Sequence, residues 1–169
     1  MRDIPTLETE RLLLRAPRED DFPIYRAFFA DAKASRFYGG PLGDGQAWRV
    51  LASDLGHWAL RGHGRWSIEL KASGHMIGGC GLWWPSGWPR SELTWWIIPP
   101  ARRKGYAVEA SRAAIRFAHE TLGWPLVETH TDDNNAAARA LIAKLGGSLI
   151  AREAFPDGQW RNVYALSSV

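Results

Sequence analysis

The residues best suited to chemistry form a short cationic segment, Arg102-Arg103-Lys104-Gly105, hereafter the basic turn. It separates an apolar, strand-like run at residues 93–98 from a helical pattern at residues 108–122. Backbone N–H groups at the start of a helix have no partner inside the helix, and the helix dipole is positive there. Gly105 has no Cβ, so an anion can approach the backbone closely. The spacing predicts a site for a phosphorylated ligand; the alternative is a solvated basic loop.

A carboxylate, Glu92, comes directly before the same apolar run. Strand alternation places Glu92 on the same face as Trp96 and Ile98. A carboxylate beside tryptophans loses part of its hydration, which raises its pKa toward the range of a useful general base. The alternative is an ion pair at the start of the strand, for example with Arg90.

The positions of the histidines and of the single cysteine do not indicate a metal site or a catalytic thiol. The histidines are His57, His63, His75, His119 and His130. They lack metal-ligand spacing with cysteine or acidic partners, so we expect scattered core or surface histidines and no metal site. The single cysteine, Cys80, precludes an internal disulfide. It lies in an apolar run without an adjacent basic group, so we expect a small buried hydrophobe rather than a catalytic thiol.

Composition bounds the class of protein. A chain of 169 residues, 46% of them hydrophobic, suits one globular domain spanning 1–169. The formal net charge of +3 is mild, and is far from the clustered charge of a nucleic-acid binder, although ten tryptophans keep that class as a rival. No signal-like apolar core opens the chain, and no window approaches the ~20 apolar residues that span a bilayer. We expect a cytoplasmic protein without membrane partners.

The order of helical and strand patterns predicts a mixed α/β domain. Strand patterns cover residues 11–15, 65–70, 75–83, 91–98, 125–131, 148–153 and 160–166. Helical patterns cover residues 18–30, 46–60 and 108–122, and a fourth runs from Asn134 or Asn135 to Gly146. Three consecutive strands in the middle preclude strict βαβ alternation, so the central sheet should be mostly antiparallel.

Further motifs accompany the basic turn. The chain opens with the charged and apolar segment 7–15, and Asn135 is followed by Lys144-Leu145-Gly146. The combination resembles the GNAT superfamily of N-acetyltransferases, and within it the Rim-type enzymes that acetylate N-termini of ribosomal proteins. The resemblance extends from about Thr6 to Ala165. It implies a twisted sheet of about seven strands flanked by about four helices, splayed between the fourth and fifth strands.

The resemblance also implies a binding mode for acetyl-CoA. The pantetheine arm would hydrogen-bond to the strand backbone at Trp96, Ile97 and Ile98. The diphosphate would meet the turn and the helix start at Arg102, Arg103, Lys104, Gly105, Tyr106 and Ala107. Arg103 stands where many relatives carry glycine.

A second family motif begins at Asn135, which matches the asparagine that contacts pantetheine. Ala138 fills the small-residue position of the same motif. The alternative for Asn135 is a helix N-cap. Ile142 stands where many relatives carry a tyrosine that acts as general acid. Ala138 stands where Rim-like relatives can carry a serine in the same role. No general acid is therefore identified, and a thiolate of pKa near ~8.5 can leave without one.

The function implied is transfer of acetyl from acetyl-CoA directly to a primary amine, either a protein N-terminus or a small amine, in a ternary complex. An alkylammonium has a pKa near ~10.4, so Glu92 would serve as the base that removes its proton. The alternative is a non-catalytic acyl-CoA-binding or sensing module. A homodimer is plausible by resemblance. The loop that carries Trp83, Trp84 and Trp88 would line either an acceptor pocket or a dimer contact.

Overall fold

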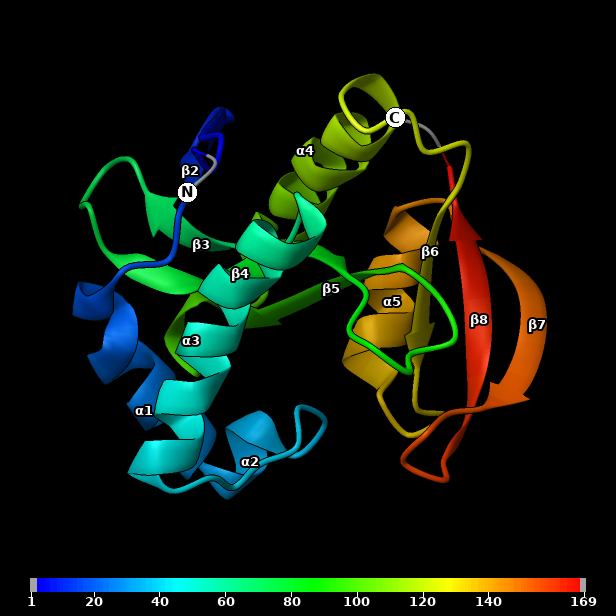
Figure 1. Cartoon of the computed structure of the whole chain (residues 1–169), viewed down its shortest axis with the longest axis horizontal. Coiled ribbons are helices and arrows are strands. Elements are labelled where there is room, and N and C mark those ends of the chain that lie inside the picture. Colours follow the sequence, from blue (N-terminus) through cyan, green and yellow to red (C-terminus); the bar gives the residue numbers. More distant parts are fainter. Residues whose placement is uncertain (1–2, 168–169) are drawn as a thin grey trace.

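The computed structural model describes residues 3–167 and contains two antiparallel sheets (Figure 1). The first has the order β1-β2-β3-β4-β5 and the second the order β6-β8-β7. The first sheet comprises β1 (Leu7–Glu8), β2 (Leu12–Arg15), β3 (Arg65–Leu70), β4 (Met76–Trp83) and β5 (Glu92–Ile97). The second comprises β6 (Val127–Thr131), β7 (Ser148–Ala154) and β8 (Trp160–Leu166).

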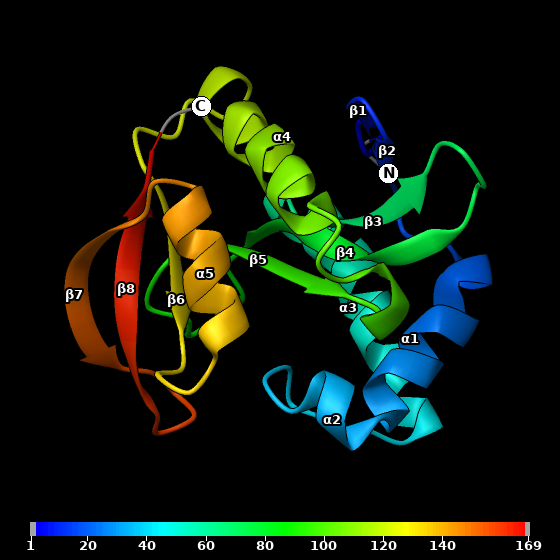
Figure 2. The same ribbon diagram turned by 180° about the vertical axis from the view of Figure 1, so that it is seen from behind.

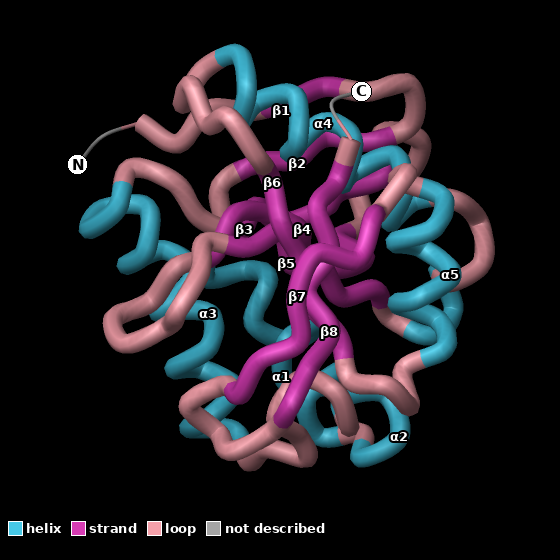
Figure 3. The backbone as a smooth tube through the Cα atoms, turned by 90° about the vertical axis from the view of Figure 1, so that its right-hand side faces the viewer, coloured by secondary structure: helices cyan, strands magenta, loops and turns pink. Residues whose placement is uncertain are grey.

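Helices cover both faces of the five-stranded sheet. They are α1 (Phe22–Ala30), α2 (Ala32–Ser35), α3 (Asp44–Arg61), α4 (Tyr106–Glu120) and α5 (Ala136–Lys144), with 3₁₀ turns at Glu19–Asp21 and Pro99–Ala101. Figures 1 and 2, seen from opposite sides, show α3 in front of the sheet and α4 behind it, while α5 packs against β6. Figure 3 shows the strands crossing the centre with helices on either side. Within residues 3–167, no helix combines the length and apolar character needed to cross a membrane.

The expected mixed α/β architecture is confirmed. The break in the sheet falls where the resemblance placed it, between the fourth and fifth expected strands, which are β5 and β6 here because β1 was not expected. Two elements were missed, β1 and the four-residue helix α2. Both are too short to show a periodicity in the sequence. The opening is also wider than a splay within one sheet, because β6, β7 and β8 form a sheet of their own.

Strand β4 brings the backbone of the sheet close to a large buried side chain, Trp96 of β5. A Cβ added to Gly79 would lie 2.5 Å from the indole nitrogen of Trp96, so the glycine leaves room for the ring. The ring packs against Tyr25 and Phe28 of α1, with centroids 4.9 and 4.6 Å away. This contact fixes β5 against the helix layer and so fixes the strand that borders the opening.

On the opposite face, α4 lies close to the sheet because its inward stripe is small. Ala110, Ala114 and Ala118 are fully buried, as the helical pattern predicted. Cys80 of β4 is buried beneath this helix, and burial raises the pKa of its thiol to about 12. A thiol with that pKa stays protonated at neutral pH, which agrees with a packing role.

Candidate active site

The basic turn leads directly into α4 and ends in an uncapped helix start. Gly105 is the N-cap residue and has a left-handed backbone, with φ of 83°. Within the described residues no side chain caps this helix, and the first amide bonded inside it is that of Glu109, which donates to the Gly105 carbonyl. The N–H groups before Glu109 therefore remain available to a ligand, and the helix dipole favours an anion there.

Arg103 also has a left-handed backbone, with φ of 62°. This conformation is uncommon for a residue with a side chain and explains why a glycine is common at this position among the proteins that the chain resembles. Left-handed residues at positions 103 and 105 turn neighbouring N–H groups toward one side, an arrangement suited to anions. Arg103 therefore holds a backbone conformation that is strained for a residue with a side chain.

Arg11, beside β2, holds the turn from behind. Its Nη1 donates a hydrogen bond to the carbonyl of Lys104 at 2.9 Å, and its guanidinium pairs with Glu109 of α4 at 2.7 Å. The guanidinium carbon also lies 4.6 Å from the ring centroid of Tyr106. Arg11 belongs to the N-terminal segment that resembles the family, but no local pattern indicates that it reaches a loop more than ninety positions away.

Arg102 is exposed, yet its guanidinium is bonded to two backbone carbonyls. Its Nε donates to the carbonyl of Ile97 at 2.9 Å, and its Nη2 donates to the carbonyl of Ala34 in α2 at 3.2 Å. Arg102 therefore links the end of β5 to α2. The side chains of Arg103 and Lys104 are exposed at the same turn.

The backbone of β5 is open on the side that faces β6. Thr129 Oγ1 donates to the carbonyl of Leu93 at 2.8 Å, so the strands are joined near one end of β5. At the other end, the N–H of Ile98 donates to Ile77, and a Cβ added to Gly78 would meet the carbonyl oxygen of Trp96 at 2.1 Å. The backbone groups of Trp96 and Ile98 thus face β4.

Alternation along an antiparallel strand then assigns the opposite edge to the intervening residues. Trp95 and Ile97 direct their N–H and C=O groups toward the opening, although the Ile97 carbonyl already accepts from Arg102. Of the residues expected to contact pantetheine through the backbone, Ile97 lies at the open edge, whereas Trp96 and Ile98 do not. Trp95 lies at the open edge together with Ile97.

A cavity of about 340 Å³ lies beside this edge, between the two sheets. It brings together Glu92, Asn135 and Ala138 from the expected site, together with Trp95. The basic turn and residues 96–98 do not line it. The residues of the expected site therefore fall into two groups, those that line the cavity and those of the basic turn.

Asn135 has the structural role that was weighed against ligand binding. Its side-chain oxygen accepts a hydrogen bond from the N–H of Ala138 at 3.1 Å and caps α5. Because Asn135 also lines the cavity, its amide nitrogen is still free to meet a ligand there. Ala138 and Ile142 are buried on α5 and carry no hydroxyl. Neither residue can therefore serve as a general acid that protonates the departing thiolate.

Glu92 opens β5 and is buried, with 7% of its surface exposed. Burial raises the pKa of its carboxyl to about 8, against the smaller lowering effects of Trp88, Arg65 and Arg161. Arg90 does not pair with it, because that guanidinium is bonded to Glu128 and Glu153 instead. The expected desolvation of Glu92 is confirmed, and the proposed ion pair with Arg90 is wrong.

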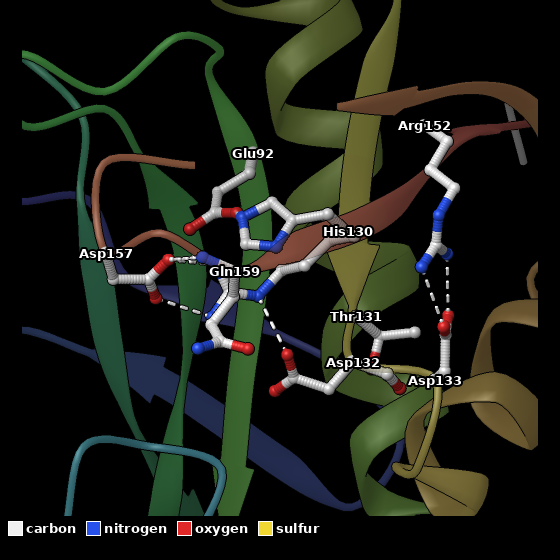
Figure 4. Close-up of polar contacts among 9 residues, drawn as sticks. Glu92, His130, Thr131, Asp132, Asp133, Arg152, Asp157 and Gln159 are labelled. Carbon is white, nitrogen blue, oxygen red and sulfur yellow. Dashed lines mark hydrogen bonds and ion pairs between the residues drawn. The ribbon is translucent and has the colours of Figure 1, made fainter. Parts of the chain in front are cut away.

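His130 of β6, which no sequence pattern singled out, contacts Glu92 directly (Figure 4). Its Nε2 meets Oε2 of the carboxyl group. The ring lies 4.1 Å from the ring of Phe155 between centroids, and burial with nearby Arg161 lowers its pKa to about 3. Burial therefore favours the neutral form of the imidazole.

Arg161 of β8 closes this side of the cavity with its charge already balanced. It donates to Asp132 at 3.1 Å and forms two bonds with Asp157, at 2.9 and 2.6 Å. Both carboxylates neutralise it, so it stabilises the wall rather than offering a free cation. Arg152 and Asp133 form a separate exposed pair nearby.

Aromatic side chains make up much of the remaining wall. Trp83 and Trp88 line the cavity, whereas Trp84 lies outside it and is 40% exposed. The loop between β4 and β5 therefore contributes to the cavity, one of the two roles considered for it. Tyr38, which the sequence did not single out, also lines the cavity, and burial raises the pKa of its phenol to about 12. Neither Tyr106 nor Tyr164 lines it.

Comparison with known proteins agrees with this geometry. The Acetyltransferase (GNAT) domain family matches residues 11–148. The Bacillus subtilis (strain 168) protein named uncharacterized N-acetyltransferase YoaA is 27% identical over 145 residues, which cover 84% of this chain and 82% of that protein.

Solved structures extend the likeness to the whole fold. A crystal structure of an acetyltransferase from Agrobacterium tumefaciens str. C58 has 35% sequence identity and a TM-score of 0.89, covering 99% of this chain and 96% of its own. The ribosomal L7/L12 alpha-N-protein acetyltransferase RimL in complex with coenzyme A has a TM-score of 0.78 over 97% of this chain and 99% of its own; at 14% identity it shows the fold alone. The chain belongs to the GNAT family of acetyltransferases and is an acyltransferase.

Proposed function

We propose that this acyltransferase moves an acetyl group from acetyl-CoA directly to a primary amine in a ternary complex, as a Rim-type N-acetyltransferase. The observation that carries the proposal is the position of buried Glu92 in a cavity beside the open edge of β5. Glu92 stands at the start of β5, the open backbone edge belongs to the same strand, and the uncapped start of α4 follows it in the chain. We propose that acetyl-CoA extends along these three features. The coenzyme A complex of RimL, which shares the fold, supports the same ligand class.

The residues present fit acetyl-CoA. Free N–H groups at the basic turn and the start of α4 would hold its diphosphate, with Arg103 and Lys104 adding charge. The open backbone groups of Trp95 and Ile97 would hold the pantetheine arm, and the amide of Asn135 would meet it from α5. When bound, acetyl-CoA supplies a thioester whose C–S bond breaks as the C–N bond to the amine forms.

Glu92 would prepare the amine for this reaction. An alkylammonium has a pKa near ~10.4, and only its neutral form is a nucleophile. A carboxylate with a pKa of about 8 is a far better proton acceptor than an exposed glutamate, and it is still partly ionised near neutral pH. Trp83 and Trp88 would exclude water and contact the apolar part of the acceptor.

A non-catalytic acyl-CoA-binding module would need the anion site but not a desolvated carboxylate in the cavity. Burying a carboxyl group without a compensating ion pair costs stability, so its presence favours a chemical role. The cavity is lined by both aromatic and charged groups, which suits either a protein N-terminus or a small amine as acceptor.

Two measurements test the proposal together. Isothermal titration with acetyl-CoA should give saturable binding that weakens as salt rises, because the diphosphate contacts are electrostatic. Release of CoA thiol should then depend on an amine from a panel of peptides with free N-termini and small alkylamines. Binding without amine-dependent thiol release would favour the non-catalytic alternative, and absence of binding would remove the proposal.

A further inference from the structure

The inference concerns His130, which no family motif assigns, and it rests on the proposed role of Glu92. We propose that neutral His130 is a positioning residue that donates Nε2–H to Oε2 of Glu92, holding the carboxylate ready and leaving Oε1 for the proton of the acceptor amine. The direct contact of the two groups carries this inference (Figure 4).

The surroundings fix the orientation of the imidazole. Phe155 packs over the ring at 4.1 Å and Trp88 lies 5.9 Å away, both between centroids. Within residues 3–167, both ring nitrogens of His130 are buried and neither makes a hydrogen bond of ordinary geometry, but Nε2 lies in direct contact with Oε2 of Glu92. Because Nε2 is the ring nitrogen beside the carboxylate, the proton of the neutral ring is best placed on Nε2, facing Oε2.

Charged groups around the pair come from several elements. Arg65 of β3 and Arg161 of β8 act on Glu92, and Arg161 and Asp157 act on His130. Both arginines are paired, Arg65 with buried Asp54 and Arg161 with Asp132 and Asp157. Their charges are therefore largely compensated, and stabilisation of an ionised Glu92 falls to neutral donors, namely the indole of Trp88 and, in this proposal, His130.

This hydrogen bond balances two requirements. Burial alone drives Glu92 toward its protonated form, in which it cannot act as a base. A donor that is itself neutral stabilises the carboxylate without adding a buried cation. When Glu92 takes the proton of the amine at Oε1, the carboxyl becomes neutral and His130 keeps its own proton, so no charge is left in the cavity.

The test is the pH dependence of kcat/KM for wild type, His130→Leu and His130→Gln with an alkylamine acceptor. His130→Leu removes the donor. The rise of kcat/KM with pH that we assign to ionisation of Glu92, hereafter the limb, should therefore move up by about one to two pH units. Turnover at pH 7 should be about tenfold slower for each unit of this shift. His130→Gln keeps an N–H at the Nε2 position and should restore most of the shift. His75→Leu, at an exposed turn, is the matched control and should leave the limb in place.

The outcomes separate this inference from the proposed function. If Glu92→Gln abolishes the limb but His130→Leu leaves it unmoved, Glu92 is the base and the role of His130 is refuted. If Glu92→Gln leaves the limb intact, the base assignment itself fails. Thermal unfolding and acetyl-CoA affinity are measured for each variant, and His130→Met replaces His130→Leu should the latter not fold.

Discussion

Nη1 of Arg11 donates a hydrogen bond to the carbonyl of Lys104, at a distance of 2.9 Å. The bond joins the residue directly before β2 to the basic turn, which we assign to the diphosphate. The same guanidinium pairs with Glu109 in the first turn of α4. Arg11 therefore fixes both the turn and the helix start, so that the free N–H groups keep one arrangement before any ligand arrives.

Replacing Arg11 by alanine should weaken acetyl-CoA binding although we place no ligand contact at Arg11. Loss of charge-assisted hydrogen bonds of about 1.5–3 kcal/mol would let the turn relax, and we expect Kd to rise about tenfold. Titration calorimetry measures the change. Arg116→Ala, on the exposed side of α4, removes the same charge without touching the turn. Equal effects of the two substitutions would show that only net charge matters.

Replacing Gly105 by aspartate should raise the Kd for acetyl-CoA by more than tenfold. Its left-handed backbone disfavours any side chain, a Cβ there would lie 3.2 Å from Nη2 of Arg11, and the added carboxylate would repel the diphosphate. Gly123→Asp is the matched control, because Gly123 has φ of 67° and open space around it. Both variants should lose stability, but only the first should lose affinity; unaltered affinity in the first removes the phosphate assignment.

Replacing Arg103 by glycine should stabilise the protein. The left-handed backbone at this position costs about 1–2 kcal/mol, and glycine gives back about 0.5–1 kcal/mol through its freer unfolded chain. We expect the free energy of unfolding in urea to rise by up to about 1 kcal/mol. Arg103→Ala removes the same charge and keeps the strain, so it should show no such gain. A glycine variant no more stable than the alanine variant would contradict the strain argument.

Much of the fold was predictable because its signals are local. Gly105 marked the turn before a helix, and the helical pattern at residues 108–122 predicted α4, which runs from Tyr106 to Glu120. Glu92 was found from its place before an apolar strand. Each of these inferences needs only a few neighbouring residues.

Other parts of the site depend on contacts between distant segments. His130 meets Glu92 only because β6 lies beside the start of β5, where Thr129 bonds to Leu93. The backbone edge offered by β5 was misjudged at Trp96, since side-chain alternation does not tell which hydrogen-bonding edge faces β4. The sequence carries no local signal for either feature.

Glu92 should also reduce stability as pH rises. Its pKa is about 8 when folded and lower when unfolded, so the folded state binds the extra proton and stability falls between the two values, by at most about 1.4 kcal/mol per pH unit. Glu92→Gln cannot ionise, so its unfolding free energy should exceed that of wild type increasingly from pH 5 to pH 8. Glu120→Gln, exposed at the end of α4, should track wild type. Parallel curves for wild type and Glu92→Gln would show that burial does not hold the carboxyl neutral.

The most direct test of the central claim is the pH profile of kcat/KM for wild type and Glu92→Gln with an alkylamine acceptor, whose own pKa near ~10.4 keeps the two titrations apart. Wild type should rise through a limb near pH 8. In Glu92→Gln that limb should disappear and the rate near pH 8 should fall about a hundredfold, with partial recovery at higher pH as free amine accumulates. A variant that keeps both the limb and the rate would contradict the account.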